Sequence, residues 1–187
     1  MLPFYYLVVI QIHGKEPNTF QKNWSSYSVG FGGIEDEEFW LGLEKVHQIT
    51  TSEKVSLDIE LTGKNYYTDY VQKTITLTWK TFEISNEADG YRLKIGDFQN
   101  NGNARALDKL NYHNGMMFST LDRDNDQCTC NCSSYYYGGG GWWFKSCSHS
   151  MLNHGNGNGP YYQFYFDQSK MILKGKPNKK LGVIFKS

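Results

Sequence analysis

The stretch from Asp122 to Cys147 reads D-R-D-N-D-Q-C-T-C-N-C-S-S-Y-Y-Y-G-G-G-G-W-W-F-K-S-C and decides how the rest of the chain is interpreted. It begins with three carboxylates at alternate positions, Asp122, Asp124 and Asp126, which is more negative charge than a short loop holds without a cation. Ca²⁺ accepts carboxylate and carbonyl oxygens in a flexible shell, so the run predicts a calcium loop. The alternative is a solvated acidic turn that holds no ion.

The aspartate run does not fit an EF-hand. An EF-hand loop needs Gly at its sixth position and Glu at its twelfth. Counting from Asp122, these positions hold Gln127 and Ser133. If the loop binds calcium, it therefore does so in another geometry.

The four cysteines, at positions 128, 130, 132 and 147, all lie in the last third of the chain. Their C-x-C-x-C spacing is also compatible with a soft metal such as zinc. A zinc site needs a second cluster of ligands, and only Cys147 with His149 offers one. The spacing alone leaves both zinc and disulfide bonds open.

The motifs D-R-D-N-D, N-C, G-G-W-W-F-x-x-C and L-N follow one another in this region, and upstream segments agree with the same family. These segments are W-x-x-Y-x-x-G-F-G from Trp24, E-F-W-L-G from Glu38, E-A-D-G-Y-R-L from Glu87 and Y-H-N-G-M-M-F-S-T from Tyr112. Together they resemble the fibrinogen-related domain of fibrinogen chains, ficolins, tachylectins and angiopoietins, from about Gln11 to Ile172. The resemblance implies an α+β fold, with a twisted antiparallel sheet, short helices and a long loop-rich calcium and ligand subdomain.

The length of the chain fits a single fibrinogen-like domain over residues 1–187. We expect a central sheet-and-helix part at 1–110, calcium and binding loops at 111–170, and a closing strand and tail at 171–187. The family's leading subdomain has no counterpart here, so we expect a fragment or an N-terminally trimmed member.

Alternating apolar and polar residues predict strands at Val55 to Leu61, Thr74 to Ile84 and Tyr91 to Ile95. The apolar segment from Leu7 to Gly14 is expected to be a core strand. Acidic residues from Glu35 to Glu38 precede the periodic run F-W-L-G-L-E-K-V-H, which predicts that a helix begins there.

The resemblance also implies a calcium site in the loop from Asp122 to Cys130, which we call the aspartate loop. The side chains of Asp124 and Asp126 and the carbonyl groups of Cys128 and Cys130 would bind the ion, and Asp122 would support the loop. The resemblance further implies a disulfide between Cys132 and Cys147, and hence a secreted, extracellular protein. Cys128 and Cys130 are extra and too close together to pair comfortably, so they are free thiols, links to another chain or buried small residues.

In ficolin-like members the calcium loop supports a pocket that binds acetyl groups through backbone N–H groups at a cis peptide, here Ser146–Cys147, and through an aromatic wall. The residues at these positions are Tyr136, Ser146, Cys147, Ser148, His149 and Tyr162. Two features depart from the family. Ser148 stands where His is common, with His149 one place later, and the segment after Asn153 is shortened and lacks part of the wall. The competing interpretation assigns these aromatic residues to packing, as we do for Trp142 and Trp143.

Composition favours recognition over catalysis and over nucleic-acid binding. Equal numbers of acidic and basic residues give no formal charge, so no nucleic-acid partner is expected. The apolar N-terminal segment is too short to span a membrane as a helix. Aromatic residues make up 16% of the chain, which suits recognition surfaces. The only nucleophile candidates, Cys147 or Cys128 with His149 or His113, lie in no protease signature, so we expect no enzyme.

We therefore predict a secreted, calcium-supported binding module with lectin-like recognition of acetylated glycans, as in innate immune pattern recognition. The alternatives are a protein- or receptor-binding module in signalling or adhesion, and a degenerate relative that binds nothing. The chain carries no segment that indicates how it would oligomerise.

Overall fold

The computed structural model describes residues 5–14, 16–64, 72–99, 101, 108–136, 138–154 and 167–176, without the side chains of residues 64, 72, 73, 135 and 136. The elements in this part of the chain are β1 (Tyr6–His13), α1 (Trp24–Val29), β2 (Phe31–Gly33), β3 (Glu38–Trp40), α2 (Leu43–Ser52), β4 (Val55–Lys64), β5 (Gln72–Ile84), η1 (Glu87–Asp89), β6 (Leu93–Gln99), η2 (Leu110–His113), α3 (Cys132–Tyr136) and β7 (Gln168–Gly175). No helix in these ranges is long and apolar enough to cross a membrane.

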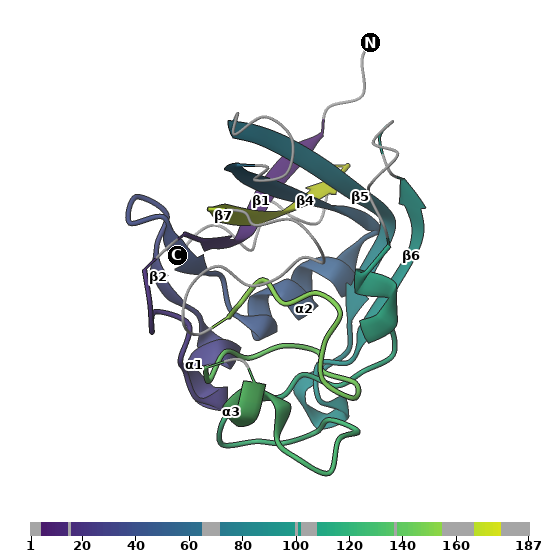
Figure 1. The fold of residues 1–187 in the computed structure, drawn as a ribbon. Helices are drawn as coiled ribbons and strands as arrows, with labels where there is room; N and C mark the ends of the chain where they lie inside the picture. The colour runs from purple at the N-terminus through teal and green to yellow at the C-terminus, as the bar shows by residue number, and fades with distance from the viewer. Residues whose placement is uncertain are drawn as a thin grey trace.

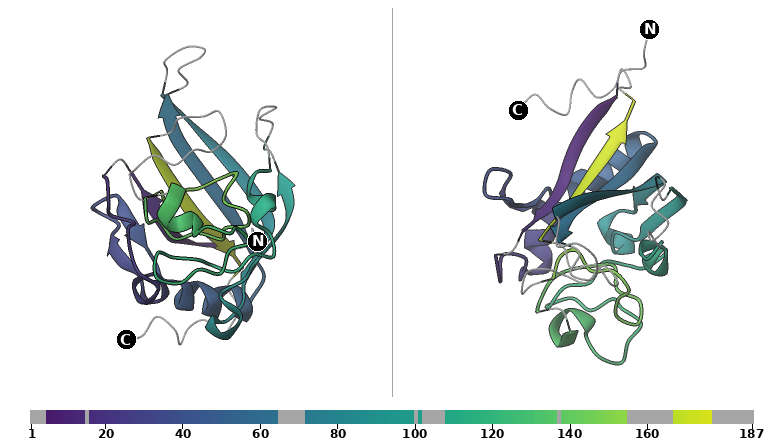
Figure 2. Two further views of the ribbon diagram at one scale, coloured as in Figure 1. Left: turned by 60° about the horizontal axis from the view of Figure 1, so that its bottom comes forward. Right: turned by 45° about the horizontal axis from the view of Figure 1, so that its top comes forward.

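The described strands form one antiparallel sheet in the order β2-β3-β1-β7-β4-β5-β6. The last strand, β7, lies between β1 and β4, so the two ends of the described chain meet in the middle of the sheet. Figure 2 (right) shows β1 and β7 side by side. In Figure 1 the sheet lies at the top and the loops around α3 lie at the bottom. The predicted α+β fold and its strands are confirmed.

The predicted helix start at the acidic run is wrong. Glu38 begins β3 instead, and its carboxylate is buried, 2.7 Å from Nδ1 of His13 and 2.9 Å from the backbone N of Gly14. Helix α2 begins only after Gly42, whose φ of 108° favours glycine and whose Cβ would lie 2.4 Å from the carbonyl oxygen of Val29. The acid pairs with a buried histidine in the strand rather than with a helix N-terminus.

A cluster of buried aromatic rings lies between the sheet and the loops. Phe118 lies at its centre, with ring centroids 5.1 Å from Tyr27 and 5.0 Å from Trp143. The Tyr27 hydroxyl accepts a hydrogen bond of 2.8 Å from the N–H of Gly141. Trp142 and Trp143 are both buried in this core, as expected for packing residues. Burying each ring stabilises the fold by roughly 2 kcal/mol. The loops are therefore anchored on a well-packed core.

Candidate calcium loop and adjoining recognition loop

The base of the aspartate loop is held on the aromatic core by Ser119 and Asn125. The backbone groups of Ser119 pair with those of Trp142 at 2.9 and 3.0 Å. The N–H of Asn125 donates to the Ser119 hydroxyl at 3.0 Å, and its side-chain amide donates to the carbonyl of Phe118 at 2.7 Å. Ser119, before the aspartates, and Asn125, between the last two of them, therefore connect the loop to buried residues.

Asp122 links the aspartate loop to α1. Its carboxylate accepts hydrogen bonds from the N–H of Trp24 at 2.9 Å and from the Thr120 hydroxyl at 2.7 Å. Burial acts to raise the pKa of Asp122, but these hydrogen bonds outweigh it and hold the pKa below its usual value. The Asp122 carboxylate therefore ties the aspartate loop to α1 through its Oδ1 atom.

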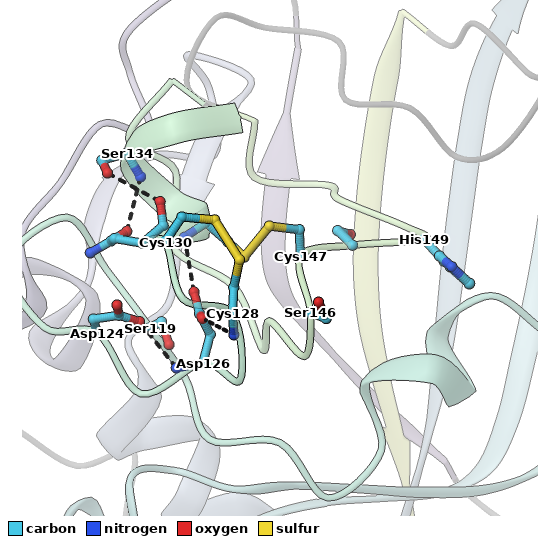
Figure 3. Close-up of a disulfide and its surroundings, with 12 residues drawn as sticks. Ser119, Asp124, Asp126, Cys128, Cys130, Ser134, Ser146, Cys147 and His149 are labelled. Carbon is cyan, nitrogen blue, oxygen red and sulfur yellow. Dashed lines mark hydrogen bonds between the residues drawn. A yellow bond between two sulfur atoms is a disulfide. The ribbon is translucent and has the colours of Figure 1, made fainter.

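Asp124 and Asp126 lie next to each other in the loop (Figure 3). The N–H of Asp126 donates to the Asp124 carboxylate at 3.1 Å. The two oxygens of Asp126 accept the N–H groups of Cys128 at 2.7 Å and Cys132 at 2.9 Å. Burial and the charge of Asp124 raise the pKa of Asp126 despite these hydrogen bonds. A nearby cation would relieve this repulsion.

The donor atoms of this loop are oxygens, the element that Ca²⁺ prefers. A carboxylate offers about four lone-pair positions, so Asp126 retains acceptor capacity beside its two N–H partners. Within the described part of the chain, no residue donates a hydrogen bond to the carbonyl oxygens of Cys128 or Cys130. Two carboxylates and two carbonyls make an all-oxygen donor set, which a hard divalent cation prefers.

All four cysteines are in disulfides, and their sulfurs lie within 4.8 Å of one another. One bond joins Cys132 to Cys147, as the resemblance implies. The other joins Cys128 to Cys130, so the expectation that these two are free thiols, links to another chain or buried small residues is wrong. Their Cα atoms are 5.1 Å apart, which is within the usual range because the loop bends sharply between them. With the thiols consumed, neither thiolate zinc ligands nor a cysteine nucleophile is available in this state.

The Cys132–Cys147 disulfide ends in the segment of residues 146–150, which we call the recognition loop. The expected cis peptide at Ser146–Cys147 is absent, because all peptide bonds in the described ranges are trans. Cys147 instead has a φ of 59°, and the N–H of Lys145 donates to the carbonyl of Cys147 at 3.2 Å. The left-handed residue turns the chain without a cis bond. The N–H of Gln127 donates to the Lys145 carbonyl at 2.8 Å and joins this segment to the aspartate loop.

His113 holds the recognition loop from the inside. Its Nδ1 atom lies 2.7 Å from the carbonyl oxygen of Trp143, so it carries the proton and donates. Nε2 then accepts the backbone N–H groups of His149 and Ser150, each at 3.3 Å. Burial lowers the pKa of His113 to about 4, with the charge of His149 adding to the effect and the Trp143 carbonyl opposing it. The ring is therefore neutral at neutral pH and is a structural contact.

The family model for the C-terminal globular domain of fibrinogen beta and gamma chains matches residues 6–177. The chain belongs to the fibrinogen C-terminal domain family. This fibrinogen-like domain has the antiparallel sheet, short helices and looped end of its relatives, so the predicted family is confirmed.

Several curated relatives align with this fibrinogen-like domain. Mouse microfibril-associated glycoprotein 4 is 39% identical over 72% of the chain and half of its own length. Mouse angiopoietin-related protein 1 is 37% identical over 68% of the chain and 24% of its own length. Human tenascin-R is 35% identical over 83% of the chain. The chain spans only a tenth of tenascin-R, so these relatives share one domain with it.

Solved structures show the same arrangement. The fibrinogen-like globe domain of human ANGPTL6 has a TM-score of 0.76 and 30% identity, covering 92% of this chain and 78% of that one. Lamprey fibrin D-dimer complexed with the peptide Gly-His-Arg-Pro-amide has a TM-score of 0.70 and 27% identity, covering 94% of this chain and 64% of that one.

The remaining predicted ligand residues of the fibrinogen-like domain are placed as follows. Ser146 and His149 are exposed, while Ser148 is half-buried and its hydroxyl lies 3.3 Å from Nε2 of His113. Tyr136 ends α3, but its side chain lies outside the described residues, as does all of Tyr162. Neither wall position is tested, and both stay predictions.

Tyr112 is a further residue of the site, and its place there was not predicted from the sequence. Its ring stacks on His149 with 3.8 Å between centroids and 14° between planes, and its hydroxyl donates to the carbonyl of Ser146 at 3.3 Å. Lys145 Nζ lies 5.4 Å from the same ring. The residue belongs to the Y-H-N-G motif, so the motif marked the segment, but only the fold brings it to the recognition loop.

Proposed function

We propose that this fibrinogen-like domain is an extracellular binding module for a protein or peptide ligand. Its contact surface is the outer side of the recognition loop together with Tyr112. The observation that carries the proposal is the inward hydrogen bonding to His113. Because the N–H groups of His149 and Ser150 turn to the core, the loop presents side chains and the Tyr112–His149 stack to solvent. An outward face of rings, hydroxyl and lysine suits a polypeptide.

The ligand class follows from what the loop offers. Acetyl recognition in the family depends on backbone N–H groups at a cis peptide, and here Ser146–Cys147 is trans. The relatives include angiopoietin-related protein 1 and tenascin-R, and the lamprey fibrin was solved with a bound peptide. These facts support a polypeptide ligand and a role in signalling or adhesion.

Calcium would support the module from the aspartate loop. Asp124 and Asp126 would hold the ion with their carboxylates, and Cys128 and Cys130 with their carbonyl oxygens. When bound, the ion supplies the positive charge that two adjacent carboxylates need. Asp126 also accepts the N–H of Cys132. An aspartate loop that is fixed by the ion would therefore also fix the position of the Cys132–Cys147 disulfide.

The extracellular setting is supported by the two disulfides, which persist in oxidising compartments. Because the disulfides consume the thiols of Cys128 and Cys147, the candidate nucleophiles are removed. We therefore propose binding and no catalysis.

A second candidate is recognition of acetylated glycans, as in innate immune pattern recognition. The observation that favours it is the stack of the half-buried Tyr112 on the exposed His149, because a flat ring offers a surface to the apolar face of a sugar. Glycan binding would then use the stack in place of backbone N–H groups.

The two candidates are separated by calorimetry with two probes, the peptide Gly-His-Arg-Pro-amide and N-acetylglucosamine. The main proposal expects calcium-dependent peptide binding that His149→Ala weakens and that chelation removes. Asp124→Asn should remove calcium uptake, whereas Glu35→Gln, a matched loss of one exposed carboxylate, should not. Binding of the sugar alone supports the second candidate. Absence of calcium uptake together with no binding of either probe contradicts both.

A further inference from the structure

A groove of about 690 Å³ crosses one end of the sheet, where β7 ends and β4 begins. A second hollow of about 450 Å³ shares Lys54 and Lys80 with it and extends to Lys94. We call the two together the lysine groove. None of its lining residues belongs to the aspartate loop or to the recognition loop, so it is a separate surface.

The lysines of this groove come from neighbouring strands. Lys174 is in β7 and stands opposite Ser56 of β4 in the strand register. Lys54 directly precedes β4, Lys80 is in β5 at the register shift between Val55 and Leu57, and Lys94 is in β6. Since β7, β4, β5 and β6 are consecutive in the sheet and strands are about 4.8 Å apart, the row is about 14 Å long.

Positive charge in the groove is not neutralised by its acids. Five lysines, including Lys176, line the two hollows against two glutamates. Glu83 pairs with Lys94 at 3.0 Å, and Glu53 accepts a hydrogen bond from the Tyr6 hydroxyl.

Two lysines of the groove remain available. Lys54 and Lys80 are exposed, and no acid in the described part of the chain pairs with either. Lys174 pairs with the buried Asp58, which holds the β7 end of the row in place. Because the whole chain carries no net formal charge, this concentration of lysines is a local feature of one surface.

We propose that the lysine groove binds a sulfated polysaccharide. Such a chain carries sulfate and carboxylate groups at regular intervals, so it can meet several lysines in a row at once. Each Lys ammonium group is a compact charge with three donors on a flexible stem, so it can adjust to the sulfate and carboxylate groups of a flexible polymer. The described lining residues include no arginine, so the guanidinium contacts that also hold single-stranded nucleic acid are not offered by them.

Heparin is the probe for this proposal, used with the intact chain in affinity chromatography and in calorimetry at low and at physiological salt. We expect retention that weakens with salt, because exposed charge pairs are screened. The double variant Lys54→Gln with Lys80→Gln should bind heparin about tenfold more weakly, from two exposed contacts. The matched control is Lys22→Gln with Lys45→Gln, which removes the same charge outside the groove and should bind as the natural chain does. Thermal melting of all three proteins confirms that each is folded.

The proposal is overturned if the natural chain is not retained on heparin beyond its retention on a plain sulfonate resin. It is equally overturned if both double variants lose affinity to the same extent. Binding to anionic lipid vesicles without binding to heparin would reassign the groove to a membrane surface and would also overturn it. The outcome does not depend on calcium or on the recognition loop, so it is independent of the function proposed above.

Discussion

Lowering the pH should loosen this domain through His113. The folded protein needs the neutral ring, because Nε2 accepts two backbone N–H groups of the recognition loop. Protonation at Nε2 would place a proton against those donors. Burial lowers the pKa of His113 to about 4 in the folded state, whereas an unfolded histidine titrates near 6.5.

The sign and the magnitude follow from these two values. The unfolded chain binds the proton first as pH falls, so the contribution of His113 is fully present above about pH 6.5 and is lost progressively towards about pH 4. Near pH 5 the loss in the free energy of unfolding is about 2 kcal/mol, and the full loss is about 3 kcal/mol. A single domain has only about 5–15 kcal/mol of stability, so this effect is measurable.

The assay is urea unfolding followed by tryptophan fluorescence at a series of pH values between neutral and about 4.5. The control is His113→Gln, which removes the titrating group, while carboxylates such as Glu38 titrate in both proteins. Unfolding free energies of the natural chain should fall relative to the variant as pH decreases, by about 2 kcal/mol near pH 5. Parallel curves for the two proteins would refute the role assigned to His113.

Three further predictions concern the aspartate loop and the core beneath it. Asp126→Asn should lower calcium affinity by more than about tenfold, because one of two carboxylates is lost; unchanged calorimetric binding would exclude this loop as the site. Replacing Cys128 and Cys130 with serine should weaken calcium binding severalfold while the chain stays folded, since the disulfide fixes both carbonyl donors; equal affinity would show that the bond is unrelated to the ion. Gly141→Ala should cost about 1–3 kcal/mol, because its Cβ would lie 2.7 Å from two aromatic rings. In Gly96→Ala the nearest atom would be 3.8 Å away, so an equal fall in the urea midpoint would contradict the packing argument.

The strands were predicted well from local sequence patterns, because the alternation of apolar and polar residues indicates which face of a strand is buried. The segment from Val55 to Leu61 alternates clearly, and β4 contains it. The helix start failed at Glu38 for a tertiary reason. Acidic residues before a periodic run normally mark a helix N-terminus. Here the carboxylate of Glu38 instead pairs with the buried His13, which lies 25 residues earlier in the chain. No local pattern contains that partner.

For the candidate site too, some features were predicted from the sequence and others depend on tertiary contacts. Three aspartates at alternate positions and the family motifs pointed to the aspartate loop, and its donor set does suit a hard cation. The pairing of Cys128 with Cys130 was missed, because two residues of separation say little about how sharply a loop bends. The trans peptide at Ser146–Cys147 was missed for a related reason, since the φ of Cys147 depends on the surrounding contacts. The lysine groove could not be predicted from the sequence. Its lysines are far apart along the chain, between Lys54 and Lys176, and only strand pairing brings them together.

The recognition loop therefore takes its shape from the core as much as from its own residues. His113 bonds to the Trp143 carbonyl, and the ring of Trp143 packs on Phe118, whose carbonyl accepts the side chain of Asn125 in the aspartate loop. One buried cluster thus fixes the bases of both loops, while the Cys132–Cys147 disulfide joins the first residue of α3, just after the aspartate loop, to the recognition loop. A ligand that meets the outer side of the recognition loop then contacts a surface already held at both ends, and little conformational entropy remains to be lost on binding.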